Sequence, residues 1–296
     1  MDRRSVVSRS MAVASIVLSI AMLLVQSAIV PAAAQAPPTL TALQRLEKQI
    51  RAVIEDEEGE VGISLLHIET GRTLAVNGDT LFPMASAFKV PLLVEVMSQI
   101  KEGRFTLDDE VRVQKTDQHL GSGMLSSLTA PGIVLSVRNL VNLMMLISDN
   151  SATDVLLAKV GAEKVNARLK GLGISGMSVN RPCQKLIMDY LGMDYAKYGH
   201  LPLDEITAVA DAVDGRWTHK DEKRAIEAFS ADPQDQATPK AMTALLAKIF
   251  RGEIIDPASC DLILDIMLKC QTGEGRIKAG LPPGTALAHK TGTIAG

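Results

Sequence analysis

The order of two kinds of hydrophobic periodicity along the chain constrains its fold more than any other feature. Alternating apolar residues predict a hairpin over residues 61–76, whereas the long middle of the chain shows the three- and four-residue spacing of helices. A strand-like stretch returns only at residues 285–294. We therefore expect an α+β fold, in which an all-α lobe of about residues 86–283 is inserted into an antiparallel sheet lobe of residues 40–85 and 284–296.

The helices can be placed from their periodicity and from the residues that cap or break them. Thr41 and Ser136 are plausible N-caps, and Pro91 is tolerated only in the first turn of a helix because proline has no N–H. Pro239 and Pro257 stand at the start of two further helices. The expected helices span residues 43–54, 88–100, 137–145, 152–160, 165–169, 241–250 and 257–269.

The start of the chain has the pattern of an export signal. Two arginines give a positive start, residues 11–31 are uncharged and apolar, and small residues precede a cleavage point after Ala34. We expect a signal peptide over residues 1–34 and a mature domain over residues 35–296 that is periplasmic or secreted. Once cleaved, the protein would have no stable membrane insertion. The alternative is an uncleaved anchor, because about 20 apolar residues can span a bilayer.

Charge and cysteine content exclude several classes of function. The formal net charge is −3 and no basic tract follows the leader, so we expect no nucleic-acid partner. The three cysteines, Cys183, Cys260 and Cys270, form no disulfide framework. Cys260 and Cys270 lie about 15 Å apart on one expected helix, which is too far to bridge. The scattered histidines have no metal-ligand spacing, so we expect no metal and no other cofactor. We also expect a monomer.

Three short motifs occur in an order that one reaction can use. They are Ser-Ala-Phe-Lys at residues 86–89, Ser-Asp-Asn at residues 148–150 and Lys-Thr-Gly at residues 290–292. Each motif is common by itself; the second, for example, is typical of turn residues at the end of a helix. Here all three occur in this order, and each lies on the type of element, helix, turn or strand, that the mechanism needs. Together they predict a serine nucleophile with its proton-transfer partners.

Four residues of these motifs are candidates for catalysis. A serine hydroxyl needs a neighbouring base, and Lys89 follows Ser86 at the spacing that shares one face of a helix. Lysine can act as a base only with a lowered pKa, and a nearby cationic Lys290 would lower it. Ser148 can relay a proton to a leaving nitrogen. The candidate catalytic residues are therefore Ser86, Lys89, Ser148 and Lys290.

The remaining motif residues are candidates for substrate binding. Asn150 can hold an amide side chain of the substrate, and Thr291, with the lysine before it, can hold a carboxylate. Gly292 leaves the strand bare, so that a substrate backbone can lie against it. The backbone N–H groups of Ser86 and Thr293 are the candidate oxyanion hole.

The three motifs are the signature of class A β-lactamases and penicillin-binding proteins, and the chain resembles class A β-lactamases from about residue 40 to its end. The similarity includes the approach to Ser86, a loop at the pocket mouth, the return to helix after the omega loop and the turn before the third motif. These segments are residues 81–86, 121–125, 237–242 and 280–284. The resemblance implies a β-lactamase/transpeptidase-like fold. It also implies a serine β-lactamase that hydrolyses the β-lactam amide bond through a Ser86 acyl-enzyme.

The omega loop departs from the family pattern. Family members have Arg-x-Glu-x-x-Leu-Asn there, in which the glutamate activates the hydrolytic water and the asparagine helps to hold it. The best match here has Cys183 in place of the glutamate and Ile187 in place of the asparagine. General base catalysis contributes about 10²–10⁴-fold, so we expect Ser86 to be acylated and its acyl-enzyme to be long-lived. Asp189 or Glu205 is an alternative base.

Two further departures concern length. Residues 189–237 form a longer stretch than in the family, and the sequence ends at Gly296. In the family, two more strands and a terminal helix follow the third motif. The resemblance therefore implies that the strand of Lys290 lacks a sheet neighbour, and we expect a truncated or incompletely recorded gene product.

Three functions remain open from the sequence. The first is a serine β-lactamase that acts on small-molecule β-lactams. The second is a penicillin-binding serine hydrolase, or a D,D-peptidase-like enzyme with a peptidoglycan-like substrate, that deacylates slowly. The third is a catalytically inactive module that binds β-lactams or peptidoglycan. Cys183 and Ile187 favour the second function, whereas the overall resemblance favours the first.

Overall fold

The computed structural model describes residues 41–216 and 218–294. The chain divides into two compact units, residues 1–42 and residues 43–296, and the fold described below is that of the second. The expected signal peptide and its cleavage point lie outside the described residues. Within the described ranges, no helix is both long enough and apolar enough to cross a membrane.

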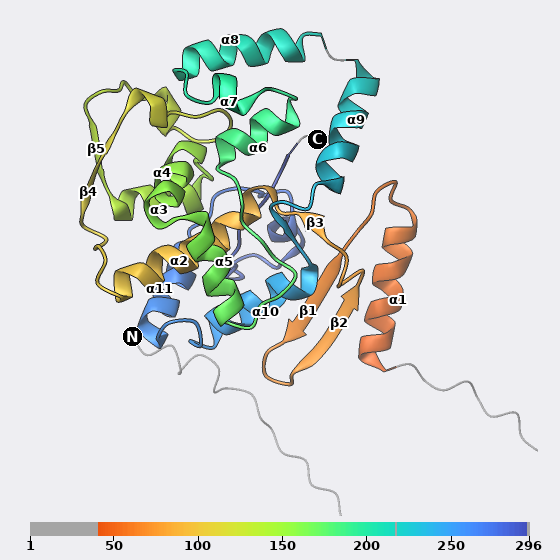
Figure 1. Ribbon diagram of the computed structural model, residues 1–296. Coiled ribbons are helices and arrows are strands. Elements are labelled where there is room, and N and C mark those ends of the chain that lie inside the picture. The colour runs from red at the N-terminus through yellow and green to blue at the C-terminus, as the bar shows by residue number, and fades with distance from the viewer. Residues whose placement is uncertain (1–40, 217, 295–296) are drawn as a thin grey trace, which may run out of the picture. The chain divides into compact units, whose positions relative to one another are not determined.

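A helix and a hairpin begin this unit, and a later helix covers the hairpin. Their bounds are α1 Ala42–Glu55, β1 Ile63–His67, β2 Arg72–Val76 and α10 Pro239–Phe250. The two strands pair antiparallel, with Leu65 opposite Leu74. Figure 1 shows α1 beside β2, and no residue of α1 is buried. Helix α10 packs on β1, where the Thr243 hydroxyl donates to the Ser64 carbonyl oxygen at 3.2 Å. The helix and hairpin expected from the sequence are confirmed.

One helix, α2, forms the centre of the main hydrophobic core. It contacts α3, α4, α5 and α11, and its residues 89–99 are all buried. The bounds of these helices are α2 Lys89–Lys101, α3 Val137–Leu146, α4 Asn150–Val160, α5 Ala162–Gly171 and α11 Pro257–Met267. Pro91 lies in the first turn of α2, where its missing N–H leaves no helical hydrogen bond unmade. Because α2 is packed on several sides, the position of its first residue is fixed by the core.

Two further pairs of short strands lie outside the hairpin. Their bounds are β3 Phe82–Pro83, β4 Glu110–Val113, β5 Ile133–Ser136 and β6 Gln236–Ala237. Strand β4 pairs with β5, and β3 pairs with β6, both antiparallel. The α+β fold is confirmed, but the lobe of residues 86–283 is not all helical, since β4, β5 and β6 lie within it. Strands of two to four residues are too short for an alternating pattern to reveal.

Four more helices, between residues 183 and 231, follow α5. Their bounds are α6 Cys183–Tyr190, α7 Tyr195–Tyr198, α8 Leu203–Asp214 and α9 His219–Ala231. Figure 1 shows α6 between α8 and α4. A small second core, formed by Met188, Met193, Ile206 and Ala210, joins α6 to α8. Helix α6 is therefore packed between the main core and this second core.

The strand expected over residues 285–294 is not formed. These residues contain no strand, and none of the described strands pairs with them. A strand needs hydrogen bonds from a neighbour along its length, and this segment instead makes isolated ones. For example, His289 N donates to the Met267 carbonyl oxygen at 3.3 Å. The second part of the expected sheet lobe, residues 284–296, thus contributes no described strand.

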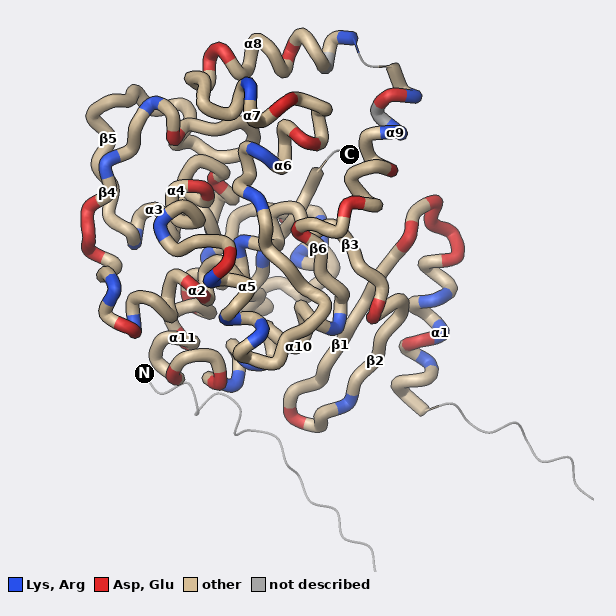
Figure 2. The backbone as a smooth tube through the Cα atoms, in the orientation of Figure 1, with Lys and Arg blue, Asp and Glu red and all other residues tan. Residues whose placement is uncertain are grey.

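Charged residues of both signs are mixed along the described helices and loops (Figure 2). Acidic residues gather in the turn after α1, within residues 55–60. This mixing agrees with the small formal net charge of −3.

Candidate active site

The candidate nucleophile lies just before the buried helix α2. Ser86 is the second residue of a short 3-10 helix, Ala85–Phe88, that leads into α2. Ala85 has a left-handed backbone with φ of +44°, which is rare for a residue other than glycine. Met84 N donates to the Asp235 carbonyl oxygen at 3.0 Å, which ties this turn to the segment after α9. The turn holds Ser86 half-buried at the edge of a cavity.

A cavity of about 480 Å³ brings the three motifs together. Five of the eight site residues expected from the sequence line it: Ser86, Ser148, Asn150, Thr291 and Thr293. The other three, Lys89, Lys290 and Gly292, contact or adjoin these lining residues. Further lining comes from residues 121–122, from α6 and from residues 272–276.

Lys89 is fully buried and is bound to the Ser-Asp-Asn turn. Its Nζ donates to the Ser148 carbonyl oxygen at 2.8 Å, to Ser148 Oγ at 3.1 Å and to Asn150 Oδ1 at 2.8 Å. Burial lowers the pKa of Lys89, although nearby groups, Cys183 first among them, act in the opposite direction. The largest cause of the lowered pKa is therefore burial and not the neighbouring Lys290 that the sequence analysis expected. A lysine with a lowered pKa can serve as a base.

Lys290 reaches the same serine. Its Nζ donates to Ser148 Oγ at 2.9 Å and to the Thr291 carbonyl oxygen at 2.8 Å. Burial, assisted by the positive charge of Lys89, lowers the pKa of Lys290 to about 7. A hydroxyl oxygen has two lone pairs, so Ser148 Oγ can accept from both lysines and keep its own proton for a third group. Ser148 is thus placed to pass protons between Lys290 and the cavity.

The Ser-Asp-Asn turn is held in an unusual backbone conformation. Ser148 has a φ of +60°. The buried Asp149 accepts hydrogen bonds from Met124 N and Leu125 N, both at 2.8 Å, and caps α4 by accepting from Ala152 N at 2.9 Å. These bonds fix a strained turn that carries a candidate catalytic residue.

Gly292 lies against the turn that carries Ser86. A Cβ atom at this position would collide with the Met84 carbonyl oxygen and crowd Ala87 N. The sequence predicts Gly292 on an open strand surface that faces the substrate. In the structure, glycine is needed because the Lys-Thr-Gly segment packs against the chain next to Ser86.

Arg276 lines the cavity, although nothing in the sequence predicts a role for it there. Its Nη1 donates to the Gly292 carbonyl oxygen at 3.0 Å, and its Nη2 donates to Thr293 Oγ1 at 2.7 Å. A guanidinium in this place can form paired hydrogen bonds with a carboxylate. No motif or spacing marks this arginine, because residues 272–276 reach the third motif only through the fold.

One side of the cavity is formed by α6 and by Leu191, which directly follows it. This α6 wall consists of Cys183, Leu186, Ile187, Tyr190 and Leu191. Both Cys183 and Ile187 line the cavity. These are the two residues that stand where the family pattern has glutamate and asparagine. Cys183 N donates to Asp154 Oδ1 at 2.6 Å, and burial raises the pKa of the Cys183 thiol. The thiol is neutral at physiological pH and is not a base for water.

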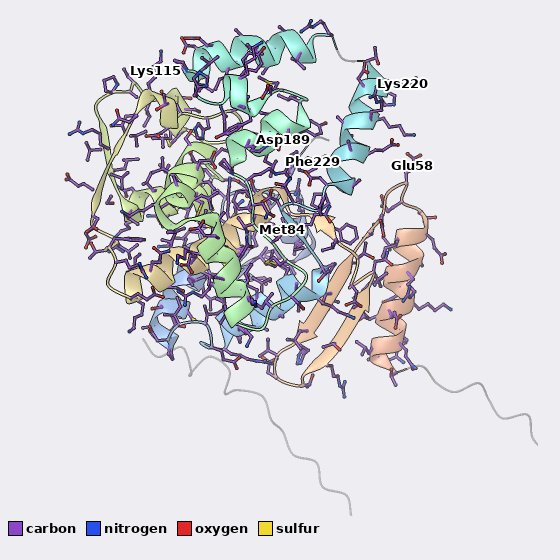
Figure 3. The ribbon with its side chains drawn as sticks, in the orientation of Figure 1. Glu58, Met84, Lys115, Asp189, Lys220 and Phe229 are labelled. Carbon is purple, nitrogen blue, oxygen red and sulfur yellow. The ribbon has the colours of Figure 1, made fainter. Side chains whose placement is uncertain are left out.

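The two alternative bases lie away from the cavity. Asp189 accepts hydrogen bonds from Arg181 at 2.8 Å and from Lys185 at 2.7 Å, and it lines a different hollow next to α9. Figure 3 shows Asp189 beside Phe229 of α9. Glu205 is exposed on α8. The geometry contradicts the hypothesis that either carboxylate activates water at Ser86.

A half-buried histidine paired with a buried aspartate supports the α6 wall. His119 Nδ1 lies 2.6 Å from Asp154 Oδ2, and His119 Nε2 lies 3.1 Å from the Thr116 carbonyl oxygen. Asp154 also accepts from Cys183 N and, at 2.9 Å, from Gln184 N at the start of α6. Burial alone would lower the pKa of His119. The hydrogen bond to Asp154 and the charge of Asp154, together with the Thr116 carbonyl and Asp117, outweigh burial, so the pKa of His119 is raised. Among the described residues, no cluster of His, Cys, Asp or Glu is placed to hold a metal ion.

Known proteins resemble the chain along most of its length. The family described as "Beta-lactamase enzyme family" matches residues 45–296. Beta-lactamase VEB-1 of Pseudomonas aeruginosa is 25% identical over 257 residues, which cover 84% of this chain and 71% of that protein. Beta-lactamase L2 of Stenotrophomonas maltophilia is 29% identical over 286 residues, which cover 95% of this chain and 78% of that protein.

Solved structures show the same similarity in three dimensions. An ancestral (GNCA) class A β-lactamase has a TM-score of 0.64 and 25% identity, covering 84% of this chain and 80% of that one. A β-lactamase from Chitinophaga pinensis DSM 2588 has a TM-score of 0.66 and 25% identity, covering 85% of this chain and 79% of that one.

Proposed function

Because the chain belongs to the β-lactamase enzyme family, we propose that it is a serine hydrolase that β-lactams acylate at Ser86 and that clears the acyl group slowly. One observation carries the proposal. Ser148 Oγ lies within hydrogen-bond distance of both Lys89 and Lys290, in a cavity that Ser86 also lines. This arrangement supplies the groups that a serine needs to lose its proton and that a leaving nitrogen needs to gain one.

In the proposed acylation, Ser86 Oγ attacks the carbonyl carbon of the β-lactam ring. Lys89, whose pKa is lowered by burial, accepts the proton of Ser86. Ser148 gives its hydroxyl proton to the ring nitrogen as the C–N bond breaks, and Lys290 replaces that proton. With a pKa of about 7, Lys290 can lose and regain a proton near neutral pH.

The proposed substrate contacts use the other residues of the cavity. The backbone N–H groups of Ser86 and Thr293 would bind the oxyanion that forms during attack. Asn150 would hold an amide of the substrate. The substrate carboxylate would lie at Thr291 and Arg276, close to the ammonium group of Lys290.

The α6 wall is the reason to propose slow clearance. Hydrolysis of the acyl-enzyme needs a group that takes a proton from water, and Cys183 carries a neutral, buried thiol at that place. Ile187 beside it cannot hold a water by hydrogen bonds. The loss of a general base is worth about 10²–10⁴-fold in rate, so a penicilloyl group on Ser86 should persist. A penicillin-binding serine hydrolase with slow deacylation is therefore favoured over a rapid β-lactamase.

Mass spectrometry of the intact protein after mixing with benzylpenicillin tests this proposal. We expect one adduct per chain, its absence in Ser86→Ala, and its persistence after the free drug is removed. Ser127→Ala, which changes an exposed serine outside the cavity, is the matched control and should react normally. Rapid clearing with product release would indicate an ordinary β-lactamase. No adduct in the unmodified chain would indicate an inactive binding module and would overturn the proposal.

Export remains part of the proposal. We propose that the protein is periplasmic or secreted, because residues 1–34 have the pattern of a signal peptide. Cell fractionation with sequencing of the mature N-terminus tests this, and a cytoplasmic protein that begins at Met1 would contradict it.

A further inference from the structure

A second hollow shares part of its lining with the cavity of Ser86. It has a volume of about 680 Å³ and is lined by residues 189–192, 213 and 216 and by α9 residues between 221 and 232. We call it the α9 hollow. It lies at the ends of α6 and α8, next to α9 (Figure 1). Tyr190 and Leu191 line both spaces. All of its lining falls within residues 189–237, the stretch that is longer than in the class A pattern.

We propose that the α9 hollow is a binding site for a small organic carboxylate with an aromatic body, separate from the cavity of Ser86. No step of the proposed acylation uses this hollow. The inference therefore goes beyond the proposed function and can be tested whether or not Ser86 is acylated.

The floor of the α9 hollow is apolar and partly aromatic. Phe229 is buried and meets Tyr190 edge to face, with the ring centroids 6.0 Å apart and the ring planes at 84°. Leu191, Val213 and Ala225 extend the apolar lining on either side. An aromatic body that covers this floor would remove apolar surface from water and could pack against the rings. The floor thus favours an apolar, ring-containing ligand.

The carboxylates that line the hollow are already bound by donors of the chain. Asp189 and Asp232 both accept hydrogen bonds from the buried Arg181, at 2.8 and 2.7 Å. Asp221 Oδ2 accepts from the backbone N of Thr218 at 3.0 Å and from its hydroxyl at 2.7 Å. Each negative charge of the lining therefore has a donor within the fold, and none of the three needs a cationic ligand.

The two cations of the lining are held differently. Arg216 and Arg224 are both exposed. Arg216 Nε donates to the Ala212 carbonyl oxygen at 2.6 Å, and this bond leaves both of its Nη groups available. Among the described residues, no carboxylate forms a hydrogen bond or ion pair with either guanidinium. Guanidinium groups bind carboxylates through paired hydrogen bonds, so the charge that remains to be matched in the hollow selects an anion.

The size of the hollow fits a small molecule with two parts. Its volume lies within the range of about 300–1,000 Å³ that is common for sites of small ligands. The ring system would lie on Phe229 and Tyr190, and the carboxylate would reach the arginines at positions 216 and 224. A biaryl acetate has this arrangement of an apolar body and a single terminal anion.

Isothermal titration calorimetry of the full-length chain with 4-biphenylacetate tests the proposal. The uncharged 4-biphenylacetamide is the matched control. We expect one site for the acid, with a dissociation constant below about 1 mM, and binding of the amide that is about tenfold weaker. In the double variant Arg216→Gln, Arg224→Gln, the acid should bind as weakly as the amide. Arg72→Gln, which changes an exposed arginine of the hairpin, should leave binding of the acid unchanged.

Two further variants locate the site. Ala228 is exposed on α9 and lines the hollow, so Ala228→Trp should fill part of the space and weaken binding of both compounds at least about tenfold. Arg276→Ala, which alters the cavity of Ser86, should leave binding of the acid unchanged. Hydrogen exchange should slow on binding at residues 189–192 and 221–232 and stay the same at residues 63–76.

The contrary results are equally definite. If Arg276→Ala weakens binding of the acid and the Arg216, Arg224 double variant does not, the probe lies in the cavity of Ser86 and the inference is overturned. Equal binding of acid and amide to the unmodified chain would show that the arginines select no anion, which also overturns it. The same holds if the acid gives no binding at millimolar concentration.

Discussion

The residue at position 183 determines whether a base is available to activate water at the acyl-enzyme. The side chain is buried against the cavity, and Lys89 lies near enough to influence its pKa. Burial and the charge of Asp154 raise the pKa of an acid at this position, and Lys89 acts in the opposite direction. A carboxylate there would therefore have a raised pKa, which suits a base that takes a proton from water. We expect Cys183→Glu to clear the benzylpenicillin adduct about 10²–10⁴-fold faster than the unmodified chain, as followed by intact mass over time. Cys183→Gln, of similar size but without charge, is the control, and equal rates in the two variants would contradict the proposed role of this position.

Arg276 allows a test of where the substrate carboxylate binds. We expect Arg276→Ala to slow acylation by benzylpenicillin about 10–10²-fold, because a hydrogen-bonded charge pair of this kind contributes about 1.5–3 kcal/mol. The methyl ester of benzylpenicillin lacks the carboxylate, so its acylation rate should change little. Stopped-flow measurement of the adduct with both compounds decides the question. If both slow equally, Arg276 acts by holding Gly292 and Thr293 and not by binding substrate.

The residues that the sequence alone could identify are those in short motifs. Ser86 and Ser148 stand in patterns that carry their chemistry within a few positions, so both could be named before the fold was known. Arg276 and His119 could not be named in this way. Their partners lie 16 or more positions away, at Gly292 and at Asp154, and only the fold brings them within hydrogen-bond distance.

At the level of elements, His119 and Asp154 join the loop before the cavity to α4 and α6. Both ring nitrogens of His119 face acceptors, the Asp154 carboxylate and the Thr116 carbonyl, and Asp117 adds a negative charge nearby. This arrangement suits a protonated imidazolium, which donates from both nitrogens. The folded-state pKa of His119 is raised above its ordinary value of 6.5. The stabilisation is therefore complete below that ordinary value and is lost as the pH rises through the raised pKa.

His119→Gln measures this contribution, because glutamine can replace one hydrogen bond but does not titrate. The quantity to compare is the difference in free energy of unfolding between the unmodified chain and His119→Gln. We expect this difference to be larger at about pH 6 than at about pH 9, by about 1–2 kcal/mol. Urea denaturation at the two pH values provides the measurement. A difference that is constant with pH, or that grows as the pH rises, would show that His119 is not protonated in the folded chain.

The elements that could be predicted from the sequence share clear local signals. Helices α10 and α11 each have proline in their first turn and a capping side chain at Thr238 or Asp256. The short strands β3 and β6 were not predicted, because a pair of two-residue strands is specified by long-range contacts and not by a repeat. The segment of residues 285–294 has the composition of a strand, yet composition does not supply the neighbouring backbone that a strand requires.

On the scale of the whole described unit, one buried cation links parts of the chain that are distant in sequence. Arg181 Nε donates to Asp235 Oδ2 at 2.7 Å, and its Nη1 donates to Asp189 at 2.8 Å and to Asp232 at 2.7 Å. Asp189 belongs to α6, whereas Asp232 and Asp235 follow α9. The same segment reaches the nucleophile, since the Asp235 carbonyl oxygen accepts from Met84 N. Arg181 thus connects the helices α6 to α9 with the turn that carries Ser86.

Removal of the Arg181 side chain should therefore destabilise more of the fold than the residues that directly contact it. Asp235 is 1% exposed, and without Arg181 its carboxylate loses its charged partner inside the fold. We expect Arg181→Ala to lower the free energy of unfolding by about 3–5 kcal/mol, as is typical when one partner of a buried ion pair is removed. Lys185→Ala, which removes a half-buried ion pair with Asp189, should cost at most about 1 kcal/mol and serves as the control.

Hydrogen exchange shows which parts of the chain lose stability in Arg181→Ala. Since α6 to α9 depend on Arg181 and α2 is packed by the main core, exchange in Arg181→Ala should accelerate most over residues 183–231 and least in α2. Acylation by benzylpenicillin should also slow, because the Asp235 segment positions the turn of Ser86 through Met84. Uniform acceleration over all helices would indicate that the unit opens only as a whole. Unchanged acylation combined with faster exchange over residues 183–231 would show that the turn of Ser86 is held by α2 alone.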